Sequence, residues 1–256
     1  MNALILAGKK DSGKLEKCSK LTNKALLMLN EMPMVEYIVN ALLGSKLVND
    51  IVVVGPEYDL TPFLEKKVTR ILESTDSIIE NVKIGLDYLK DDGNILLLTS
   101  DIPLITGEII DRFITKCEQY DAFFYYPIIT QESIIKKYPD TIRSYFTLKE
   151  GTFCGGNMVI FNSPVFDRNK ELVEELYHNR KDIKKYISIL GIKFLVKFLL
   201  KTLTIQEIET KAAQIVGYPV KSITIDDPEV MIDLDKLSDY ELILQAINQK
   251  TPNSSS

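Results

Sequence analysis

The sequence predicts an α/β fold with a mainly parallel central sheet flanked by helices. Two observations lead to this prediction. Short apolar runs rich in Val, Ile and Leu alternate with segments of helical periodicity over the first half of the chain. Several of these runs end directly in Gly, Pro, Ser or Asp, as expected of buried parallel strands whose loops gather at one edge of the sheet. Ligands of such sheets bind at the carboxyl ends of the strands, so the loops there are the first candidates for function.

The elements of the first half follow one another as strand and helix. The run Ala-Leu-Ile-Leu at residues 3–6 is a buried strand that ends in Ala7-Gly8. Helical periodicity over 34–43 begins directly after Pro33, and the Val-rich run 51–54 is a second strand that ends at Gly55. Residues 68–72 predict a weaker third strand. A helix over 77–89 follows, because its apolar positions fall on one face: Ile78, Val82, Leu86 and Leu89.

Residues 94–98, Asn-Ile-Leu-Leu-Leu, predict a central strand that ends in Thr99-Ser100-Asp101. A helix over 107–117 and a strand over 122–126 come next. The second half is less regular: we expect strands over 142–149, 157–161 and 220–225, and helices over 164–177, 187–200 and 235–248. No internal repeat and no clear linker divides the chain, so we expect one domain over residues 1–250 and a disordered tail at 251–256.

Composition narrows the class of protein. With 256 residues, of which 45% are hydrophobic, the chain can bury one sizeable core. A formal net charge of −5 gives no basis for nucleic-acid binding. The three cysteines form no CxxC pair, and the single histidine, His178, argues against structural zinc. No signal peptide precedes the first strand, so we expect a cytoplasmic protein with reduced thiols.

The loop after the first strand contains part of a phosphate-binding pattern. Residues 8–14, Gly-Lys-Lys-Asp-Ser-Gly-Lys, fit the start of the P-loop, but Leu15 stands where that loop needs Ser or Thr to bind Mg²⁺. An ATPase loop is therefore not expected. Gly8 and Gly13 still allow a phosphate to approach the backbone closely, and Lys9 and Lys14 add positive charge. The alternative is a solvated, charged loop with no ligand.

A longer block, LILAGKKDSGKL…NKALLMLNEMPMVEYIVNAL, resembles the N-terminal signature of the MobA-like NTP transferases, which are nucleotidyltransferases of the GT-A type with a Rossmann-like fold. The chain has Lys9 where the family usually has a second Gly, and only Lys14 where an Arg is usual. The resemblance implies a nucleotide-binding half over 1–127 and an acceptor-binding half over 128–250. It also implies phosphate contacts by Lys24 and nucleotide contacts by the loop residues Leu6, Ala7, Gly8, Lys9, Gly13 and Lys14.

An acidic residue, Asp101, follows the central strand. A carboxylate there can bind Mg²⁺ together with substrate phosphates, and the alternative is a cap on the next helix. The segment Ser100-Asp-Ile-Pro-Leu resembles the family's metal motif, which implies Mg²⁺ on Asp101 and nucleotide contact by Ser100. The late segment 226–239 resembles the family's second acidic stretch, and Asp233 is the implied second metal ligand. We expect Asp235 to cap the N-terminus of the last helix.

Two more segments resemble the substrate-binding parts of the family. Residues 73–82 resemble its base-side segment, which implies nucleotide contacts by Ser74, Ser77 and Asn81; Ser77 or Asp76 would also serve as an N-cap. This segment is too generic to choose among CTP, GTP and UTP.

Residues 143–158 resemble the acceptor-side hairpin, which ends in Gly-Gly-Asn. Arg143 and Lys149 would hold an anionic acceptor beside Gly155, Gly156 and Asn157. The alternative is a Gly-Gly bulge in an edge strand.

A basic stripe marks the predicted helix over 187–200, where Lys193, Lys197 and Lys201 recur every four residues. These lysines interrupt the most apolar stretch of the chain, so we do not expect it to span a membrane. We expect a solvated lysine face above an apolar face turned to the core. The alternatives are a lid, a dimer face or a helix that lies on a membrane surface.

Together these resemblances imply a Mg²⁺-dependent nucleotidyltransferase. It would transfer an NMP from an NTP, which we expect to be CTP or GTP, to a phosphorylated or hydroxyl small-molecule acceptor, with release of pyrophosphate. Lys24 and Asp101 would be its catalytic residues. We expect a monomer or homodimer. One alternative is a GT-A glycosyltransferase with a nucleotide-sugar donor, although the Asp101 segment lacks the second Asp of a D-x-D motif. Another is a non-catalytic nucleotide sensor.

Overall fold

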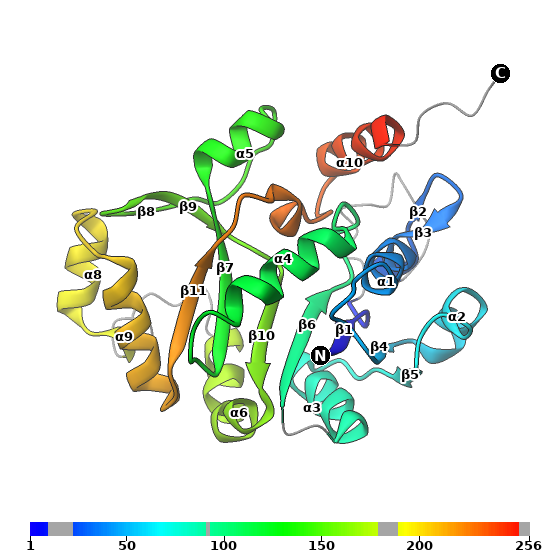
Figure 1. The fold of residues 1–256 in the computed structure, drawn as a ribbon, viewed down its shortest axis with the longest axis horizontal. Helices are drawn as coiled ribbons and strands as arrows, with labels where there is room; N and C mark the ends of the chain where they lie inside the picture. The colour runs from blue at the N-terminus through cyan, green and yellow to red at the C-terminus, as the bar shows by residue number, and fades with distance from the viewer. Residues whose placement is uncertain (10–22, 91–92, 179–188, 251–256) are drawn as a thin grey trace.

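A computed structural model describes residues 1–9, 23–90, 93–178 and 189–250. Within these residues a nine-stranded sheet lies between layers of helices (Figure 1), which confirms the predicted α/β fold. The strands of this sheet are β1 (Asn2–Leu6), β4 (Ile51–Gly55), β5 (Arg70–Glu73), β6 (Asn94–Thr99), β7 (Phe124–Thr130), β8 (Phe146–Leu148), β9 (Gly151–Gly155), β10 (Met158–Asn162) and β11 (Val220–Thr224). A separate small ribbon pairs β2 (Met28–Leu29) with β3 (Met32–Pro33).

The helices come between the strands along most of the chain. They are α1 (Met34–Leu43), α2 (Glu57–Leu64), α3 (Ile78–Leu89), α4 (Gly107–Cys117), α5 (Gln131–Lys137), α6 (Ser163–His178), α8 (Ile192–Leu199), α9 (Ile205–Val216) and α10 (Leu237–Lys250). Short 3₁₀ helices, η1 (Lys24–Leu26) and η2 (Pro228–Met231), precede β2 and α10.

Strand order explains how the two halves of the chain meet. The sheet runs β5-β4-β1-β6-β10-β7, with β9 and β8 beyond β7, and β11 also pairs with β7. The first four strands of this order are parallel, so their carboxyl ends share one edge. Strand β10 is antiparallel to β6, with Met158 opposite Leu98. The start of β10 therefore lies beside the end of β6, which brings Asn157 next to Thr99 and Ser100.

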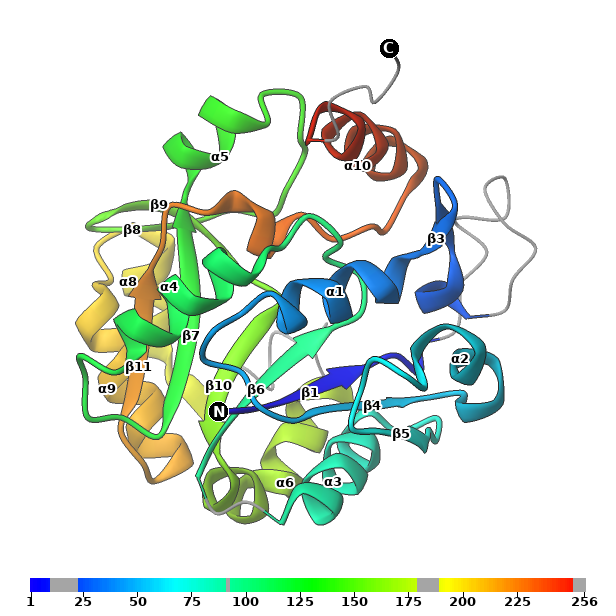
Figure 2. The same ribbon diagram turned by 45° about the vertical axis from the view of Figure 1, so that its right-hand side comes forward.

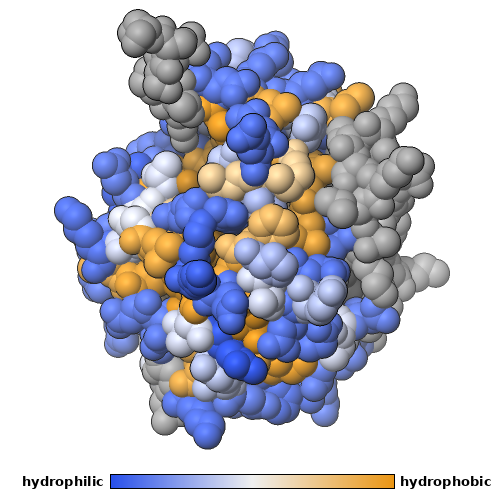
Figure 3. All heavy atoms as spheres, turned by 90° about the vertical axis from the view of Figure 1, so that its right-hand side faces the viewer, coloured by the Kyte–Doolittle hydropathy of each residue, from blue (hydrophilic) through white to orange (hydrophobic). Residues whose placement is uncertain are grey.

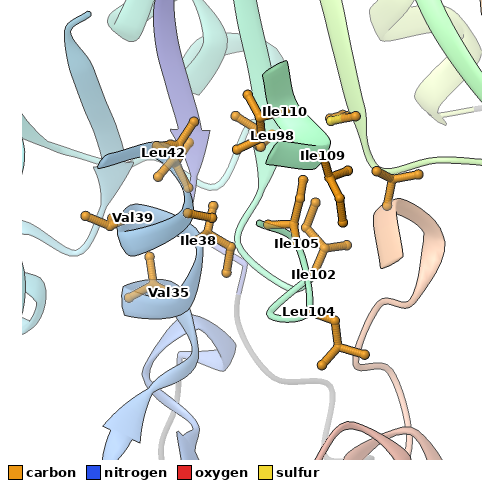
Figure 4. Close-up of a cluster of buried hydrophobic side chains, with 14 of the residues drawn as sticks. Val35, Ile38, Val39, Leu42, Leu98, Ile102, Leu104, Ile105, Ile109 and Ile110 are labelled. Atoms are coloured by element: carbon orange, nitrogen blue, oxygen red, sulfur yellow. The ribbon is translucent and has the colours of Figure 1, made fainter. Parts of the chain in front are cut away.

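A buried core supports this edge on one face of the sheet. Ile38 and Leu42 of α1 point toward Leu98 and the residues that follow it, Ile102 and Ile105 (Figure 4). Burial of these large side chains holds the backbone on both sides of Asp101 in place. The opposite face is covered by α3 and α6, whose apolar side chains form a second cluster with alternate residues of the same strands.

The close contact between α1 and α4 depends on a glycine. A Cβ atom added at Gly107 would lie 2.4 Å from the carbonyl carbon of Gly44, which is backbone that cannot rotate away. The two helices therefore pack at a distance that no larger residue at position 107 permits.

Most predicted elements of the first half are confirmed, and two of them, 34–43 and 107–117, have the predicted ends. Three helices within the described residues were not predicted. Helix α2 carries Pro62 in its last turns, which weakens the helical pattern, and α5 is short. Helix α9 begins with a capping box between Thr204 and Glu207, a signal that the sequence contains.

The predictions for the second half need correction. The strand expected over 142–149 is only β8, and the strand expected over 122–126 is shifted to β7, which continues through Pro127. Proline fits there because Pro127 lies between the part of β7 that pairs with β10 and the part that pairs with β9. The tail at 251–256, the loop residues Gly13 and Lys14, and the start of the helix predicted over 187–200 lie outside the described residues.

The basic helix α8 is turned differently from the prediction. Lys197 forms an ion pair with Glu207 of α9, and Phe194 packs on an apolar cluster, whereas Ile192 and Leu199 are 64% and 68% exposed. The apolar side chains are thus divided between core and surface. None of the described helices combines the length and apolar character needed to cross a membrane.

The surface on the side of α2 is mixed in hydropathy. Hydrophilic side chains there are interspersed with smaller hydrophobic areas (Figure 3). Among the exposed apolar or aromatic residues of the chain, Leu43, Tyr58 and Phe63 belong to α1 and α2. Singly exposed side chains of this kind are normal in soluble proteins and imply no partner.

Candidate functional site

The candidate site lies at the carboxyl edge of the parallel strands. Leu6 is opposite Thr99, and the backbone N–H of Ser100 donates to the carbonyl of Leu6 at 3.2 Å. Gly8 and Lys9 therefore leave the sheet beside Asp101. This is the edge at which the sequence predicted the ligand.

Lys24 reaches this edge from η1. Asn23 holds the start of η1 in place, because its Nδ2 donates to the carbonyl of Ala7 at 2.9 Å and its Oδ1 accepts from the N–H of Ala25 at 2.8 Å. The Lys24 ammonium then lies 2.6 Å from Oδ2 of Asp101 and 2.6 Å from Oδ1 of Asp235. Only 4% of the Lys24 side chain is exposed.

Three carboxylates meet at this lysine. Asp101, Asp233 and Asp235 each offer an oxygen, and these oxygens lie within 4.8 Å of one another. The segment after η2 supplies two of them by simple alternation, because Ile232 and Leu234 are buried while Asp233 and Asp235 face the site. The N–H of Leu234 donates to the carbonyl of Asp101 at 2.9 Å, which fixes the segment against the end of β6. We call these three aspartates the acidic cluster.

The acidic cluster has unequal proton affinities. Burial, together with the nearby charge of Asp101, raises the pKa of Asp233 to about 6, although Arg143 opposes the shift. Burial acts in the same direction on Asp235, but the hydrogen bond and the charge of Lys24 outweigh it and hold the pKa of Asp235 below its ordinary value. Burial lowers the pKa of Lys24, and Asp101 and Asp235 more than compensate, so the net shift is upward. The lysine is therefore an ammonium at neutral pH.

A cavity of about 460 Å³ opens on one side of the acidic cluster, and we call it the nucleotide-side cavity. Of the predicted nucleotide contacts, its walls include Leu6, Gly8, Lys9, Lys24, Asn81 and Ser100, with Asp101 at the same wall. Four residues that were not predicted as nucleotide contacts also line this cavity: Thr75, Asp76, Ile78 and Thr99.

Three predicted nucleotide contacts have other positions. Ala7 is fully buried beneath the loop, and Ser77 caps α3, because its Oγ accepts from the N–H of Glu80 at 3.2 Å. Ser74 packs against Gly8, where an added Cβ would lie 2.8 Å from the serine Oγ. Gly8 is thus required by close packing within the protein.

Asn81 shapes the wall of the nucleotide-side cavity. Its Oδ1 accepts from the N–H of Thr75 at 2.7 Å, and its Nδ2 donates to the carbonyl of the same residue at 3.0 Å. This pair of bonds fixes the loop before α3. Asn81 therefore acts on the cavity by holding Thr75 as well as by lining it.

A second cavity, of about 470 Å³, lies on the other side of the acidic cluster, and we call it the acceptor-side cavity. Of the residues predicted to hold the acceptor, Arg143, Gly155 and Asn157 line it, together with Asp233 and Asp235. The backbone of Asn157 joins the two halves of the site, because its carbonyl accepts from the N–H of Thr99 and its N–H donates to Val230.

Gly155 and Gly156 pack on the strand beside them. A Cβ added at Gly155 would lie 2.0 Å from the Oη atom of Tyr126, and one at Gly156 would lie 2.9 Å from Pro127. The paired glycines let β9 turn into β10 against β7. Their close approach is to the protein's own side chains.

Arg143 is already paired inside the protein. Its Nη1 lies 2.8 Å from Oδ1 of Asp233 and its Nη2 lies 3.2 Å from Oδ1 of Asp239. Because only 8% of the Arg143 side chain is exposed, its positive charge is largely neutralised by these two carboxylates. The arginine supports the wall and the acidic cluster, and the prediction that it is free to hold an anion needs this correction.

Two further residues lie elsewhere than the sequence suggested. Lys149 lies in the turn between β8 and β9, at the far end of the hairpin from Gly155, and does not line the acceptor-side cavity. Asp235 does not cap α10, because its carboxylate faces Lys24; the cap-like bonds come from Oδ2 of Asp239, which accepts from the N–H groups of Asp235 and Lys236.

A cation that prediction missed, Lys236, does line the acceptor-side cavity. It directly follows the alternating Asp-Leu-Asp segment, and that adjacency is the only signal for it in the sequence. The segment that carries it, between β11 and α10, crosses above α4 in Figure 2. Among the described ion pairs none involves Lys236.

Known proteins resemble the chain in sequence and in fold. The family model described as MobA-like NTP transferase domain matches residues 3–187. A 2-C-methyl-D-erythritol 4-phosphate cytidylyltransferase from Clostridium botulinum is 29% identical over 129 residues, which are 48% of this chain and 56% of that protein. The match thus spans little more than half of the length of that relative.

Solved structures extend the likeness over nearly the whole chain. A hypothetical transferase from Thermus thermophilus has a TM-score of 0.82 and 30% identity, over 93% of this chain and 98% of that one. A nucleotidyl transferase from Methanothermobacter has a TM-score of 0.59 and 16% identity, with 98% of both chains covered, and shows the same fold.

Proposed function

Because this chain belongs to the MobA-like NTP transferase family, we propose that it is a Mg²⁺-dependent nucleotidyltransferase. It transfers an NMP from an NTP to a small-molecule acceptor and releases pyrophosphate. The observation that supports this proposal best is the position of the acidic cluster and Lys24 between two cavities of nearly equal size. One cavity suits the donor, the other suits the acceptor, and the charged groups lie where the two substrates would meet.

The NTP occupies the nucleotide-side cavity in this proposal. Its phosphates lie along Gly8 and Lys9 toward Lys24, and its base lies near Thr75 and the start of α3. Cationic side chains and backbone N–H groups at the end of a strand are the usual partners of phosphates. The cytidylyltransferase relative makes CTP the first donor to test, with GTP next.

The acidic cluster fits a magnesium ion. Mg²⁺ takes oxygen ligands and commonly rests on one or two carboxylates together with substrate phosphates. Asp101 and Asp233 are the predicted ligands, and the structure adds Asp235, whose oxygen lies within the same 4.8 Å. When bound, the ion supplies charge neutralisation at the α-phosphate. The protein supplies the three carboxylates and Lys24, which set where the phosphates lie.

The reaction then needs no protein nucleophile. An oxygen of the acceptor attacks the α-phosphorus in line, the new P–O bond forms, and the bond to the β-phosphate oxygen breaks to release pyrophosphate. Positioning and electrostatic stabilisation provide most of the rate enhancement in such transfers. Residues 1–127 would bind the donor and 128–250 the acceptor, although Asp233 and Asp235 come from the second part of the chain.

Lys236 is the cation that we assign to an anionic acceptor. Arg143 is held between Asp233 and Asp239, so its charge is already balanced. Lys236 and the side chain of Asn157 line the acceptor-side cavity with no carboxylate partner among the described ion pairs. A phosphorylated acceptor would bind between them and the acidic cluster.

Thermal unfolding with CTP, GTP, UTP and ATP, each with and without Mg²⁺, tests the donor. A ligand at 100 times its Kd adds about 2.7 kcal/mol of stability, and each kcal/mol raises Tm by roughly 2–4 °C at this size. We expect a Mg²⁺-dependent shift of several degrees with one NTP. The absence of a shift with every NTP would contradict the proposal.

Pyrophosphate release then tests the chemistry. The donor identified by unfolding is incubated with a panel of sugar phosphates and polyol phosphates that includes 2-C-methyl-D-erythritol 4-phosphate. Release that depends on one acceptor supports the transferase. Binding of NTP without release for any acceptor would indicate a nucleotide sensor, and a shift only with nucleotide sugars would indicate a glycosyltransferase.

A further inference from the structure

The Lys24 ammonium occupies the position that a cation needs at the acidic cluster. It lies 2.6 Å from one oxygen of Asp101 and 2.6 Å from one oxygen of Asp235. Both aspartates belong to the acidic cluster, whose carboxylates could ligate a metal. A lysine and a divalent ion that share the same oxygens repel each other, since like charges about 4 Å apart cost several kcal/mol at an effective dielectric constant of about 20.

The surroundings hold Lys24 beside Asp101 and Asp235 while the substrates are absent. Its side chain is 4% exposed, and η1 is fixed by the bonds of Asn23 to the backbone. The second lysine nearby, Lys9, is 64% exposed and lies farther away, at 3.8 Å from Asp101 and 3.4 Å from Asp235. Lys24 is therefore the buried cation that pairs most closely with Asp101 and Asp235.

We propose that Lys24 is an internal counter-ion that competes with the metal for Asp101 and Asp235 and leaves them when the metal enters with the nucleotide. The idea rests on the proposed function, because it takes the acidic cluster as the magnesium site. Lys24 also lines the nucleotide-side cavity, so movement of the end of its side chain is enough to bring the ammonium from the carboxylates to a triphosphate.

This exchange couples the binding of the metal to the binding of the NTP. Metal alone must displace Lys24 without offering it another anion, so it binds weakly. Metal that arrives with an NTP supplies phosphates to receive the ammonium, so each ligand strengthens the binding of the other by the same factor. The nucleotide-free protein thereby avoids tight capture of a divalent ion.

Mn²⁺ binding to the nucleotide-free protein tests the exchange. Free Mn²⁺ is followed by electron paramagnetic resonance for the wild type, Lys24→Met and the matched control Lys9→Met. We expect Lys24→Met to bind Mn²⁺ at least about tenfold more tightly than the wild type, because a competing charge is removed. Lys9→Met should change the affinity less than about threefold, because this lysine is exposed and screened. Equal or weaker binding by Lys24→Met would overturn the proposal.

Thermal unfolding of the same proteins gives a second measurement. Without nucleotide, Mn²⁺ should raise the Tm of Lys24→Met more than that of the wild type, since the ion replaces the lost counter-charge. If Lys24→Met does not yield folded protein with or without Mn²⁺, Lys24→Gln serves for both measurements, with the same expectations. A wild type stabilised by Mn²⁺ as strongly as the variant would contradict the exchange.

Failure of this inference and failure of the proposed function are distinguishable. A wild type that releases pyrophosphate with a suitable acceptor, combined with unchanged Mn²⁺ affinity in Lys24→Met, would leave the transferase and remove the exchange. Tighter Mn²⁺ binding by Lys24→Met in a protein that releases no pyrophosphate would leave the exchange as a property of a nucleotide sensor.

Discussion

The nucleotide-side and acceptor-side cavities have nearly the same volume, about 460 and 470 Å³, but they are built in different ways. The first is lined largely by residues that directly follow parallel strands, such as Gly8 and Ser100. The second is lined by a loop around Arg143, the end of β9 and the segment before α10. A strand end is positioned by the whole ladder of the sheet, whereas the loops of the acceptor side are positioned by pairs of side chains.

The buried cations beside the two cavities also differ in how they are held. Lys24 meets two carboxylates at an edge that opens into a cavity, so it can change partners. Arg143 is enclosed between Asp233 and Asp239 and has the role of a brace. The comparison therefore predicts ligand binding by Lys24 and structural support by Arg143.

The largest effect should come from Asp101, the carboxylate of the acidic cluster that lines the nucleotide-side cavity. We expect Asp101→Asn to lower turnover at least about a hundredfold, because electrostatic stabilisation of the reacting phosphate is lost. The amide has nearly the same shape, so circular dichroism should show an unchanged fold. Pyrophosphate release measures the rate. Turnover close to that of the wild type would remove Asp101 from the catalytic machinery.

Arg143→Met tests whether the arginine is a brace. Removing one partner of a buried ion pair costs about 3–5 kcal/mol, and we expect about 2–3 kcal/mol here because the Asp233 side chain is 22% exposed. Urea unfolding gives the free energy of unfolding. If stability is unchanged and only the KM of the acceptor rises, Arg143 binds substrate and the distinction drawn above is wrong.

Lys236→Ala tests the cation of the acceptor side. We expect the KM of a phosphorylated acceptor to rise about tenfold, because one charge-assisted hydrogen bond is lost. The KM of the NTP and the free energy of unfolding should stay near the wild-type values. Steady-state kinetics with each substrate varied in turn separates these effects. An increase confined to the KM of the NTP would contradict the role of Lys236 in binding the acceptor.

The smallest effect is expected for Lys149→Ala, which is the matched control for Lys236→Ala. The residue lies in the β8–β9 turn, remote from Gly155 at the other end of β9. Both kinetic constants should change less than about twofold, as is usual for an exposed surface position. A tenfold increase in the KM of the acceptor would restore the role that the sequence suggested.

The same contrast explains what the sequence could predict. Lys24 and Asp101 could be proposed from the sequence because each lies in or next to a local pattern, the opening block and the end of an apolar strand. The contact between Asp235 and Lys24 was not predicted because the two residues are 211 positions apart in the sequence. Arg143 and Asp233 are 90 positions apart, so no local pattern shows that they pair. Lys236 was passed over because a lysine near the start of a helix resembles any solvated residue.

The hydrogen bond from Leu234 to Asp101 has a consequence for the time at which the site forms during translation. The chain is made from its N-terminal side, and β1, β4 and β6 precede Asp101. Asp233 and Asp235 follow more than 130 residues later. Until the ribosome has passed them, Lys24 has only Asp101 as a partner. A message interrupted after codon 230 would thus yield a chain with the nucleotide-side strands but a single carboxylate of the acidic cluster.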